Sequence, residues 1–477
     1  MNRKKYILSG VCLFVIISLL SGCSYQKKEE LTLVTEAGFA PYEYYSNGKI
    51  IGVDIEIAEK IANALGKKLV VKDVAFDSII NEVKTGKSDI GAAGISYTEE
   101  RAKEVLFTDN YSTSKQIIIV NKESNVTSKE NLSGKVAVQL GTTADSYLTK
   151  NSTVTLVREK KFLATIQDLK DGKVNAVVMD ELPALKLVTS QMKILDEPLV
   201  TDSYGMVIAK GNTELLKKCN QVIKKMKESG EIDKILLKHM GESSEIEEKS
   251  TIFTRFYQSV IYDARYKYIL EGIKNTLVIA IGAVILGIIL GIFLAFIRHY
   301  HDEVGRFKIL NFLSKSYIHV IRGTPSILQL MIIYYVVFKN MSISIVLVGI
   351  LAFGMNSAAY VAEIIRAGLN SVDKGQIEAG YALSLNYREV MRKIVFPQAI
   401  RNILPALGNE FITLVKETSV GAYIGIVELT KASDIIASRT YDYFFPLILI
   451  ALIYFVITFS LSKLISLMER RLNYVGD

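Results

Sequence analysis

Histidine and cysteine are scarce: the 477 residues include four His and three Cys. With so little histidine, and with no grouping of a nucleophile with a base or of metal-binding side chains, nothing supports an enzymatic role or a metal site. We expect no cofactor. Cys12 and Cys23 lie in the N-terminal leader, so Cys219 stands alone and no internal disulfide is expected.

A complete phosphate-binding loop is also missing. Gly86-Lys87-Ser88 matches the second half of G-x-x-x-x-G-K-[ST], but Asn81 stands where the first glycine is required. We therefore expect that the chain carries no ATPase of its own. No stretch matches a TVGYG-type channel filter, and only about nine residues follow the last apolar run, too few for an output domain.

The first 23 residues predict an export signal. A basic "MNRKK" precedes the apolar "YILSGVCLFVIISLL", and Leu20-Ser21-Gly22-Cys23 resembles a bacterial lipobox, in which the cysteine is lipidated. We expect a lipoprotein-type signal peptide, residues 1–23, with lipidation at Cys23. The alternative is an uncleaved anchor helix, and in both cases the residues that follow lie outside the cytoplasm.

Composition changes sharply near residue 265. Beyond it come apolar runs such as "TLVIAIGAVILGIILGIFLAFI" (276–297), which are long enough to cross a bilayer as a helix. Five spans are predicted, at about 269–297, 317–338, 343–365, 404–426 and 444–468. Lys and Arg are concentrated in the two inner loops and the tail, so the net charge of +8 reflects positive-inside topology rather than nucleic-acid binding. This topology places residues 366–403 in the cytoplasm.

Residues 31–242 alternate short β-rich runs with helical patterns. "LTLVT" (31–35) and "KLVVKDV" (68–74) predict strands, and "DIEIAEKIANALG" (54–66) predicts a helix that Gly66 ends. The rhythm indicates an α/β domain with parallel sheets and two lobes, residues 31–118 with 204–242, and 119–203. A ligand cleft is expected at the carboxyl ends of the strands. Residues 243–267 form a connector.

The N-terminal half resembles a known family. "FDSIINEVKTGKSDIGAAGISYTEERAKEVLFTDNY" and "LSGKVAVQLGTTADSY" are similar to the polar amino-acid solute-binding proteins of ABC importers, which have a two-lobed periplasmic-binding-protein fold. An amino acid needs a fixed cation for its carboxylate, and the guanidinium of Arg101 can bond both oxygens. The resemblance implies Asp180 for the α-ammonium, Thr142 for the carboxylate and Glu36 at the far end of the side chain. The predicted ligand-binding residues are Glu36, Phe39, Phe76, Ala93, Gly94, Ser96, Arg101, Gln139, Thr142 and Asp180.

The alternatives are that Arg101 is a solvated surface charge, that Phe39 and Phe76 are core aromatics, and that Asp180 caps a turn. Gln139 stands where relatives often have Lys, and Glu36 where Asp is common. Loss of a cation beside a retained anion favours a basic ligand. Basic amino acids and neutral polar ones such as glutamine both stay open.

The C-terminal half, residues 268–470, resembles the histidine/glutamine-type permease subunit of the same importers. The matching blocks include "RGTPSILQL" (322–330) and "AAYVAEIIRAGLNSVDKGQIEAG" (358–380). "IEAGYALSL" is similar to the signature loop that docks on a separate ABC ATPase. Glu378, Ala379 and Pro397 fit the pattern, whereas Gly380 replaces an Ala and Ser384 replaces a Gly. One such loop per chain implies a homodimer with two ATPase subunits.

Several polar residues fall inside predicted spans, where contact with lipid would be costly. They should face the bundle interior or a water-filled path, and the candidates are Asn356, Glu363, Glu410, Lys416 and Glu417. Lys416 could instead pair with Glu410 or Glu417. Arg322-Gly323-Thr324-Pro325 predicts a kink.

These features predict the substrate-binding and membrane-translocating subunit of an ATP-driven importer of polar or basic amino acids. The protein would be multi-pass in the bacterial cell membrane, with the binding domain outside. The alternative is a ligand-gated ion channel, which also joins a two-lobed receptor to membrane helices.

Overall fold

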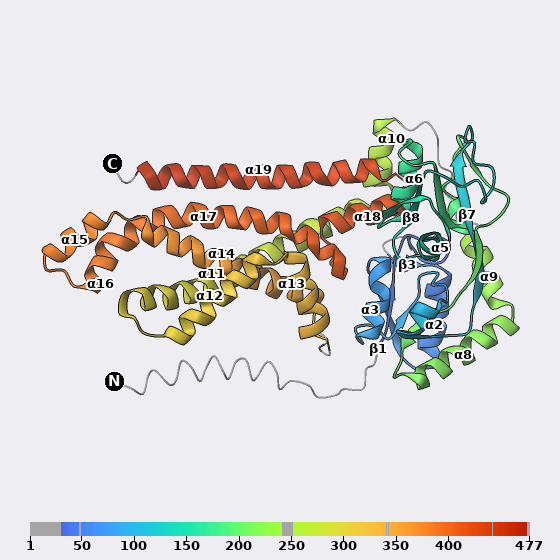
Figure 1. The fold of residues 1–477 in the computed structure, drawn as a ribbon, viewed down its shortest axis with the longest axis horizontal. Helices are drawn as coiled ribbons and strands as arrows, with labels where there is room; N and C mark the ends of the chain where they lie inside the picture. The colour runs from blue at the N-terminus through green and yellow to red at the C-terminus, as the bar shows by residue number, and fades with distance from the viewer. Residues whose placement is uncertain are drawn as a thin grey trace.

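The computed structural model describes residues 30–46, 49–240, 251–339, 341, 343–440 and 442–474. The expected signal peptide with Cys23 and residues 243–250 of the expected connector lie outside this range. Two bodies are joined end to end: an α/β receptor domain and a long helical body, which together give the molecule its elongated shape (Figure 1). The helices α15 and α16 lie at the end of the helical body that is farthest from the receptor.

The first lobe of the receptor is built on a five-stranded sheet of order β4-β1-β5-β13-β6. Strands β1, β4 and β5 are parallel, and β13 runs antiparallel to both of its neighbours. The strands are β1 (Glu30–Thr35), β4 (Lys68–Asp73), β5 (Ile90–Gly91), β6 (Val105–Phe107) and β13 (Val207–Ala209), with the hairpin β2 (Tyr44–Ser46) and β3 (Lys49–Ile51). The helices are α2 (Val53–Ala64), η1 (Phe76–Ser78), α3 (Ile79–Lys84), α4 (Glu99–Ala102), α8 (Thr213–Glu228) and α9 (Glu231–Met240).

The second lobe has a sheet of order β11-β7-β10-β8-β9, and β12 also pairs with β7. Its strands are β7 (Ser112–Asn121), β8 (Lys135–Gln139), β9 (Thr155–Glu159), β10 (Ala176–Asp180), β11 (Met192–Ile194) and β12 (Val200–Tyr204). Its helices are α5 (Thr143–Asn151), α6 (Phe162–Lys170) and α7 (Glu181–Leu185).

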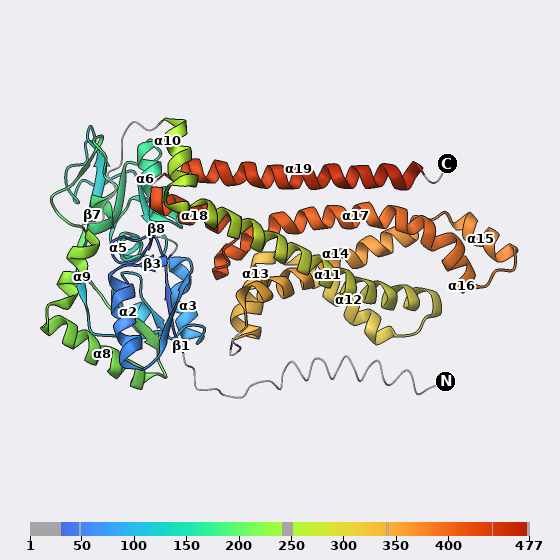
Figure 2. The same ribbon diagram turned by 180° about the vertical axis from the view of Figure 1, so that it is seen from behind.

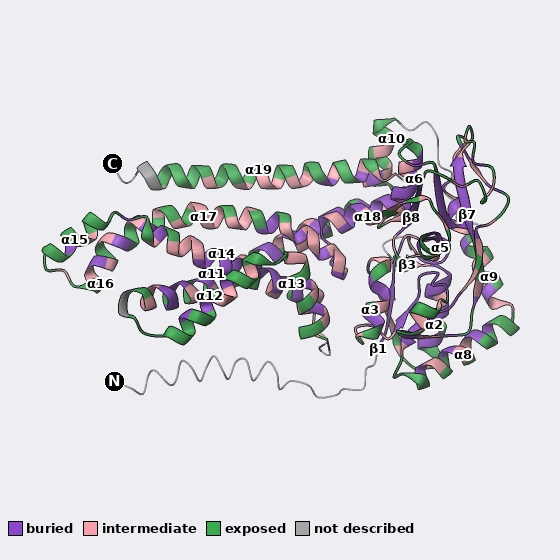
Figure 3. Ribbon diagram, in the orientation of Figure 1, coloured by how far each residue is buried: buried purple, intermediate pink, exposed green. Residues whose placement is uncertain are grey.

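Two expectations for the receptor need correction. The sheets are mixed rather than parallel, because β13 runs antiparallel in the first sheet and β7 runs antiparallel to its neighbours in the second. Strands β7 and β12 pair as an antiparallel ribbon where the chain passes between the lobes. The register of this ribbon begins at Ser112 and Tyr204, so the second sheet starts before residue 119. Apolar side chains of both lobes, including Leu33, Ile119 and Val177, belong to one buried core cluster. Strands such as β7 are accordingly coloured mostly as buried in Figure 3.

The helical body begins with α10 (Ile252–Phe256), η2 (Tyr257–Ile261) and η3 (Tyr262–Ala264). Next are α11 (Tyr266–Val304), α12 (Lys308–Gly323), α13 (Ser326–Ile332), η4 (Ile333–Val337) and α14 (Ile345–Asn370). The far end contains α15 (Lys374–Ala382), α16 (Tyr387–Val390) and η5 (Met391–Val395). The chain returns through α17 (Phe396–Glu417), η6 (Thr418–Ile424), α18 (Leu429–Thr440) and α19 (Phe444–Tyr474).

Helices α11 and α14 form the main packed pair of this body. A Cβ on Gly287 would lie 2.8 Å from Ser357 Oγ, and one on Gly291 would lie 2.6 Å from Val361 Cγ1. Glycine at these two positions therefore allows the helix backbones to approach closely, as is common between membrane helices.

Within the described residues, α11, α14 and α19 are long and apolar enough to span a membrane, and the bent pair α12–α13 would make a fourth. The bend of 111° lies at Thr324-Pro325 and confirms the predicted kink. The fifth expected span, 404–426, corresponds to α17 followed by η6. It is not apolar enough to count among the candidate membrane spans, because α17 carries Asn409, Glu410, Lys416 and Glu417. It packs against α14 and α19.

The region between the fourth and fifth expected spans is not a simple loop. It forms α18, which lies between the helical body and the receptor in both opposite views (Figures 1 and 2). Most of α18 is buried, including Leu429, Ile435 and Ile436.

Candidate functional site

All ten residues predicted to bind a ligand line one cavity with about 340 Å³ of empty volume, which we call the ligand cavity. Glu36, Phe39 and Arg101 come from the first lobe, whereas Gln139, Thr142 and Asp180 come from the second. Glu43, Gln116 and Thr143 complete its lining. The cavity thus lies between the lobes, at the carboxyl ends of β1, β8 and β10.

Arg101 lies in the first turn of α4, where its backbone N–H donates to Thr98 Oγ1 at 3.2 Å. Its guanidinium donates to Ser96 O in the first lobe and to Gly141 O in the second, each at 2.7 Å. It also stacks 5.5 Å from the centre of the Phe76 ring. Arg101 is therefore held in place by both lobes and is not a solvated surface charge.

Asp180 ends β10 and is only 8% exposed. Its Oδ1 accepts from Gln116 Nε2 at 2.8 Å, from Ser114 Oγ at 3.1 Å and from the Tyr204 hydroxyl. Burial, followed by the neighbouring Asp202 carboxylate, raises the pKa of Asp180 to about 7, and the three hydrogen bonds oppose this rise. A buried carboxyl with a raised pKa beside a cationic guanidinium is typical of a functional site.

Glu36 already has a cationic partner. Its Oε2 accepts from Gln139 Nε2 at 2.9 Å, and its Oε1 accepts from Lys161 Nζ. The expectation that this anion had lost its neighbouring cation is therefore wrong, because Lys161, at the N-terminus of α6, supplies one from the second lobe. The preference for a basic ligand depended on an anion without a neighbouring cation, so this argument no longer holds.

Three other residues that were predicted to contact the ligand make hydrogen bonds within the protein. The backbone N–H of Gly94 donates to Asp54 Oδ2 at 3.1 Å. The hydroxyl of Thr142 donates to Gln139 O at 2.8 Å and caps α5 by accepting from Asp145 N. Ser96 Oγ donates to Asp202 Oδ2 at 2.5 Å.

Phe39 lines the cavity and also belongs to the core, where its ring packs edge-on against Phe162 at 5.9 Å. Gly94 has φ +52°, and a Cβ there would lie 2.7 Å from Phe39 Cε1. The left-handed backbone and the close ring together explain glycine at this position. Ala93 is buried beside it.

Sequence reasoning missed four polar residues: Lys161, Asp202, Gln116 and Glu43. They fall in helix caps, strands and a turn, with no spacing that distinguishes them from surface polar residues. Glu43 is fully buried, and burial with the neighbouring Asp54 carboxylate raises its pKa well above the usual range. Only the packing of the two lobes brings these side chains together.

The predicted docking loop, residues 366–403, forms the far end of the helical body. Asp373 caps α15 by accepting from Gly375 N at 2.7 Å. Glu378 and Ala379 are exposed on α15, and Pro397 is exposed in the first turn of α17. Gly380 instead points inward, where a Cβ would lie 2.7 Å from Ile394 Cδ1, so it is a packing position within the loop.

Ser384 adopts a left-handed backbone with φ +58°, the conformation expected of the glycine it replaces. Ser384→Gly should therefore stabilise the loop by about 1 kcal/mol, because glycine has no Cβ to strain this conformation. The measurement is the apparent Tm of the purified full-length protein, which should rise. Ala382→Gly, two residues earlier in right-handed helix, should lower it, and an unchanged Tm in both variants would contradict the interpretation.

The polar residues of the expected pathway have mixed environments. Glu363 contacts three arginines: Arg298, Arg366 at 2.8 Å and Arg322 at 3.9 Å. Asn356 Nδ2 donates to Gln329 Oε1 at 2.9 Å. Glu410 accepts from Ser357 Oγ at 2.7 Å.

The alternative pairing of Lys416 is not observed. Its side chain is exposed, and no ion pair in the described part of the chain joins it to Glu410 or Glu417. Glu363 thus belongs to an ionic network, whereas Glu410 lies in the packed region between α14 and α17.

Two family models match the chain. Residues 31–242 match the bacterial extracellular solute-binding proteins, family 3, and residues 287–474 match the inner-membrane component of binding-protein-dependent transport systems. The arginine transport system permease protein ArtQ of Bacillus subtilis is 40% identical over 208 residues, which are 43% of this chain and 93% of that protein. The chain belongs to the binding-protein-dependent ABC importers.

This importer subunit joins in one polypeptide two components that its relatives match separately. A protein of Rickettsia typhi, named as the permease GlnP of a glutamine transport system, is 37% identical over 46% of this chain and 96% of its own length. Among solved structures, an ancestral arginine-binding protein bound to arginine is 39% identical over 45% of this chain and 99% of that one, with a TM-score of 0.43. The substrate-binding protein AbpA of Streptococcus pneumoniae, bound to L-arginine, is 34% identical over 46% of this chain and 97% of that one, with a TM-score of 0.43.

The importer is a membrane-embedded, multi-pass protein, as predicted, and the families that it matches are solute-binding proteins and permease components. The alternative of a ligand-gated channel receives no support from these relatives.

Proposed function

We propose that this chain is the substrate-binding and membrane-translocating subunit of an ATP-driven importer of amino acids with long polar or basic side chains. The observation that carries this proposal is the ligand cavity, where the Arg101 guanidinium and the Asp180 carboxyl lie between two lobes. The curated relatives named for arginine and glutamine transport support the same ligand class.

In the proposed complex, Arg101 binds the α-carboxylate through its fork of N–H donors. Asp180 accepts the α-ammonium, and Phe39 and Phe76 flank the side chain. The end of the side chain reaches the group formed by Glu36, Gln139 and Lys161, which contains both donors and acceptors. Such an end can bind the carboxamide of glutamine as well as a guanidinium, provided that Glu36 exchanges its present partners.

Energy for transport would come from a separate ABC ATPase that docks on the exposed residues of the loop 366–403, among them Glu378 and Ala379. The receptor lies at the opposite end of the helical body (Figure 1), and this separation supports a receptor outside the cell and a docking loop in the cytoplasm. The excess of Lys and Arg in the same inner loops favours that orientation. We propose a homodimer with two ATPase subunits, since each chain contributes one loop, and lipidation at Cys23.

The decisive experiment is uptake of radiolabelled arginine, glutamine, lysine and histidine by proteoliposomes that contain the full chain and its ATPase. ATP-dependent accumulation of at least one is expected, with none when ATP is omitted. Calorimetric titration of the same purified chain with the twenty amino acids ranks the ligands. If no amino acid bound, the receptor assignment would be refuted.

Amino-acid binding should weaken below about pH 7. The folded-state pKa of Asp180 is raised to about 7 from an ordinary 3.8, so its ionisation is disfavoured in the folded protein and the carboxyl is neutral at lower pH. A neutral carboxyl cannot pair with the α-ammonium, and the dissociation constant should rise by about tenfold per pH unit between about pH 7 and 5. The bound ammonium favours the ionised carboxylate and therefore lowers the pKa of Asp180 in the complex.

Calorimetry across this pH range checks the expectation, with Asp180→Asn as the test variant and Asp54→Asn as its control. Burial raises the pKa of Asp54 to about 6, yet it does not line the ligand cavity. The slope should disappear in Asp180→Asn and persist in Asp54→Asn. A slope retained in Asp180→Asn would assign the titration to another group.

A further inference from the structure

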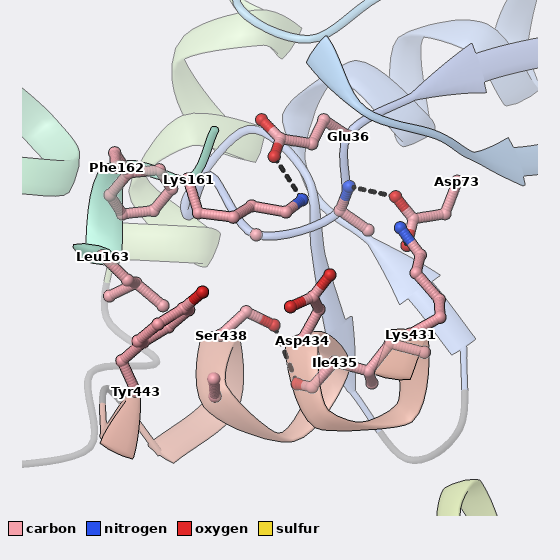
Figure 4. Close-up of a pocket in the computed structure, with 13 residues that line it drawn as sticks. Glu36, Asp73, Lys161, Phe162, Leu163, Lys431, Asp434, Ile435, Ser438 and Tyr443 are labelled. Atoms are coloured by element: carbon pink, nitrogen blue, oxygen red, sulfur yellow. Dashed lines mark hydrogen bonds and ion pairs between the residues drawn. The ribbon is translucent and has the colours of Figure 1, made fainter. Parts of the chain in front are cut away.

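A second cavity, with about 370 Å³ of empty volume, lies between the receptor and α18, and we call it the interface cavity (Figure 4). The charged side chains that line it are Glu36, Asp73 and Lys161 from the receptor, and Lys431 and Asp434 from α18. Glu36 lines the ligand cavity as well. Its side chain is therefore part of the wall between the place where the amino acid binds and the membrane half.

Lys431 fixes the first lobe to α18. Its Nζ lies 2.8 Å from Asp73 Oδ2, and both side chains are almost completely buried, at 3% and 6% exposed. Asp73 also accepts from Ala37 N and from the Tyr45 hydroxyl, each at 3.0 Å. A buried pair with these additional hydrogen bonds is costly to break, because either charge left alone would be buried without a partner.

Asp434 follows Lys431 by three residues, so both side chains project from the same face of α18. Figure 4 shows its carboxylate pointing into the interface cavity, toward the side where the ammonium groups of Lys161 and Lys431 lie. No hydrogen bond to the Asp434 carboxylate is found within the described residues. Burial raises its pKa, and the two lysines oppose that rise, Lys161 more strongly than Lys431.

Lys161 belongs to the second lobe and at present donates to Glu36 of the first. This contact bridges the lobes, so they cannot separate at this point unless Lys161 leaves Glu36. Lys161 is mostly buried, and burial alone would lower its pKa, but the carboxylates of Glu36, Asp434 and Asp73 together raise it above the ordinary value. Separation without a replacement anion would leave a buried ammonium unpaired, which is strongly disfavoured.

We propose that Asp434 is the residue of the membrane half that opens the receptor, by accepting Lys161 when the lobes separate. Lys431 keeps the first lobe on α18 while Lys161 exchanges Glu36 for Asp434. One carboxylate replaces another, so the number of paired charges is conserved. The same movement breaks the ionic contact of Glu36 with the second lobe, so that only the hydrogen bond from Gln139 Nε2 still holds Glu36 there. Once that bond also breaks, part of the wall between the two cavities is removed and the amino acid can pass from the ligand cavity toward the helices.

This inference rests on the proposed import function and predicts that Asp434→Asn separates binding from transport. In proteoliposomes with the ATPase, the initial uptake rate should fall by about tenfold, which corresponds to about 1.4 kcal/mol. Amino-acid affinity of the full chain in nanodiscs should stay within about twofold of the unsubstituted protein, because Asp434 does not line the ligand cavity.

Asp442→Asn is the matched control. Asp442 is near the same interface, where it contacts Arg255 at 3.7 Å and its Oδ1 accepts from Phe444 N, but it does not line the interface cavity. Asparagine can still accept from that N–H group, so uptake should be unchanged. Uptake by Asp434→Asn at the unsubstituted rate, or an equal loss of binding and uptake, would overturn the proposal. Absence of uptake by the unsubstituted protein would refute the import function itself.

A distance measurement tests the movement directly. Spin labels at Asn63→Cys in the first lobe and Thr153→Cys in the second, both exposed positions, report lobe separation in the full transporter. With a nonhydrolysable ATP analogue, the label distance should increase in the unsubstituted protein and remain at its resting value in Asp434→Asn. An equal increase in both proteins would show that Asp434 is not required for opening.

Discussion

Arg101→Ala is expected to weaken amino-acid binding by more than about 100-fold, or roughly 3 kcal/mol. The loss is large because the proposed contact with the α-carboxylate is a buried, charge-assisted pair, and truncation of one partner leaves the other charge without compensation. Burial lowers the pKa of this guanidinium, although Asp202 and Asp180 oppose the shift. Calorimetric titration of the full-length protein with the best ligand measures the effect.

Arg158→Ala is the matched control for Arg101. Arg158 also lies in the receptor and pairs with Asp145 at 2.8 Å, but its side chain is 40% exposed and outside the ligand cavity. Its removal should leave affinity within about twofold. Equal affinities of Arg101→Ala and the unsubstituted protein would contradict the proposed binding mode.

Arg101 also joins the lobes through Ser96 O and Gly141 O, so its loss affects closure as well as direct binding. Arg101→Lys separates the two roles, because lysine keeps the charge and loses the planar fork. We expect this variant to bind with intermediate affinity. An affinity as low as that of Arg101→Ala would assign the main role to the fork geometry rather than to the charge.

Glu378→Arg is expected to lower ATP-dependent uptake by more than about tenfold. Glu378 is exposed on α15, at the end of the protein that we propose as the ATPase docking surface. Reversal of a charge on such a surface places it against groups that complement the native one, which costs several kcal/mol across an interface. Uptake and amino-acid-stimulated ATP hydrolysis by the reconstituted complex both report the loss.

Two comparisons make this result specific to docking. Glu469→Arg, an exposed reversal near the end of α19 and outside the loop, should transport normally. Amino-acid binding by Glu378→Arg should also be unchanged, since the ligand cavity is at the opposite end of the protein. Normal uptake by Glu378→Arg would exclude α15 as the docking surface.

Much of the architecture follows from local sequence features. The alternation of β-rich and helical runs predicted β1, α2 and β4 close to their observed positions, because period and turn residues act within a few positions of one another. Pro325 predicted the sharp bend between α12 and α13, since proline disrupts the helix locally. The ten ligand-cavity residues followed from the family resemblance, and the fold brings them together.

The misses concern partners that are distant along the chain. Glu36 and Lys161 are 125 residues apart, and Asp73 and Lys431 are farther apart still. Their pairing depends on how lobes and helices pack, which no spacing in the sequence specifies. For the same reason the sequence did not reveal that Gly380 packs against Ile394 within its own loop.

The sequence by itself determined that the chain joins a two-lobed receptor to a membrane half, with no phosphate-binding loop of its own. These conclusions depend on composition, periodicity and short motifs, all of which are local. Only the tertiary structure decided which charges meet: Lys161 with Glu36 across the lobes, and Asp434 facing both lysines from α18. Ion pairs act over a few ångströms in space rather than along the chain, so the contacts between receptor and membrane half became evident only in the folded protein.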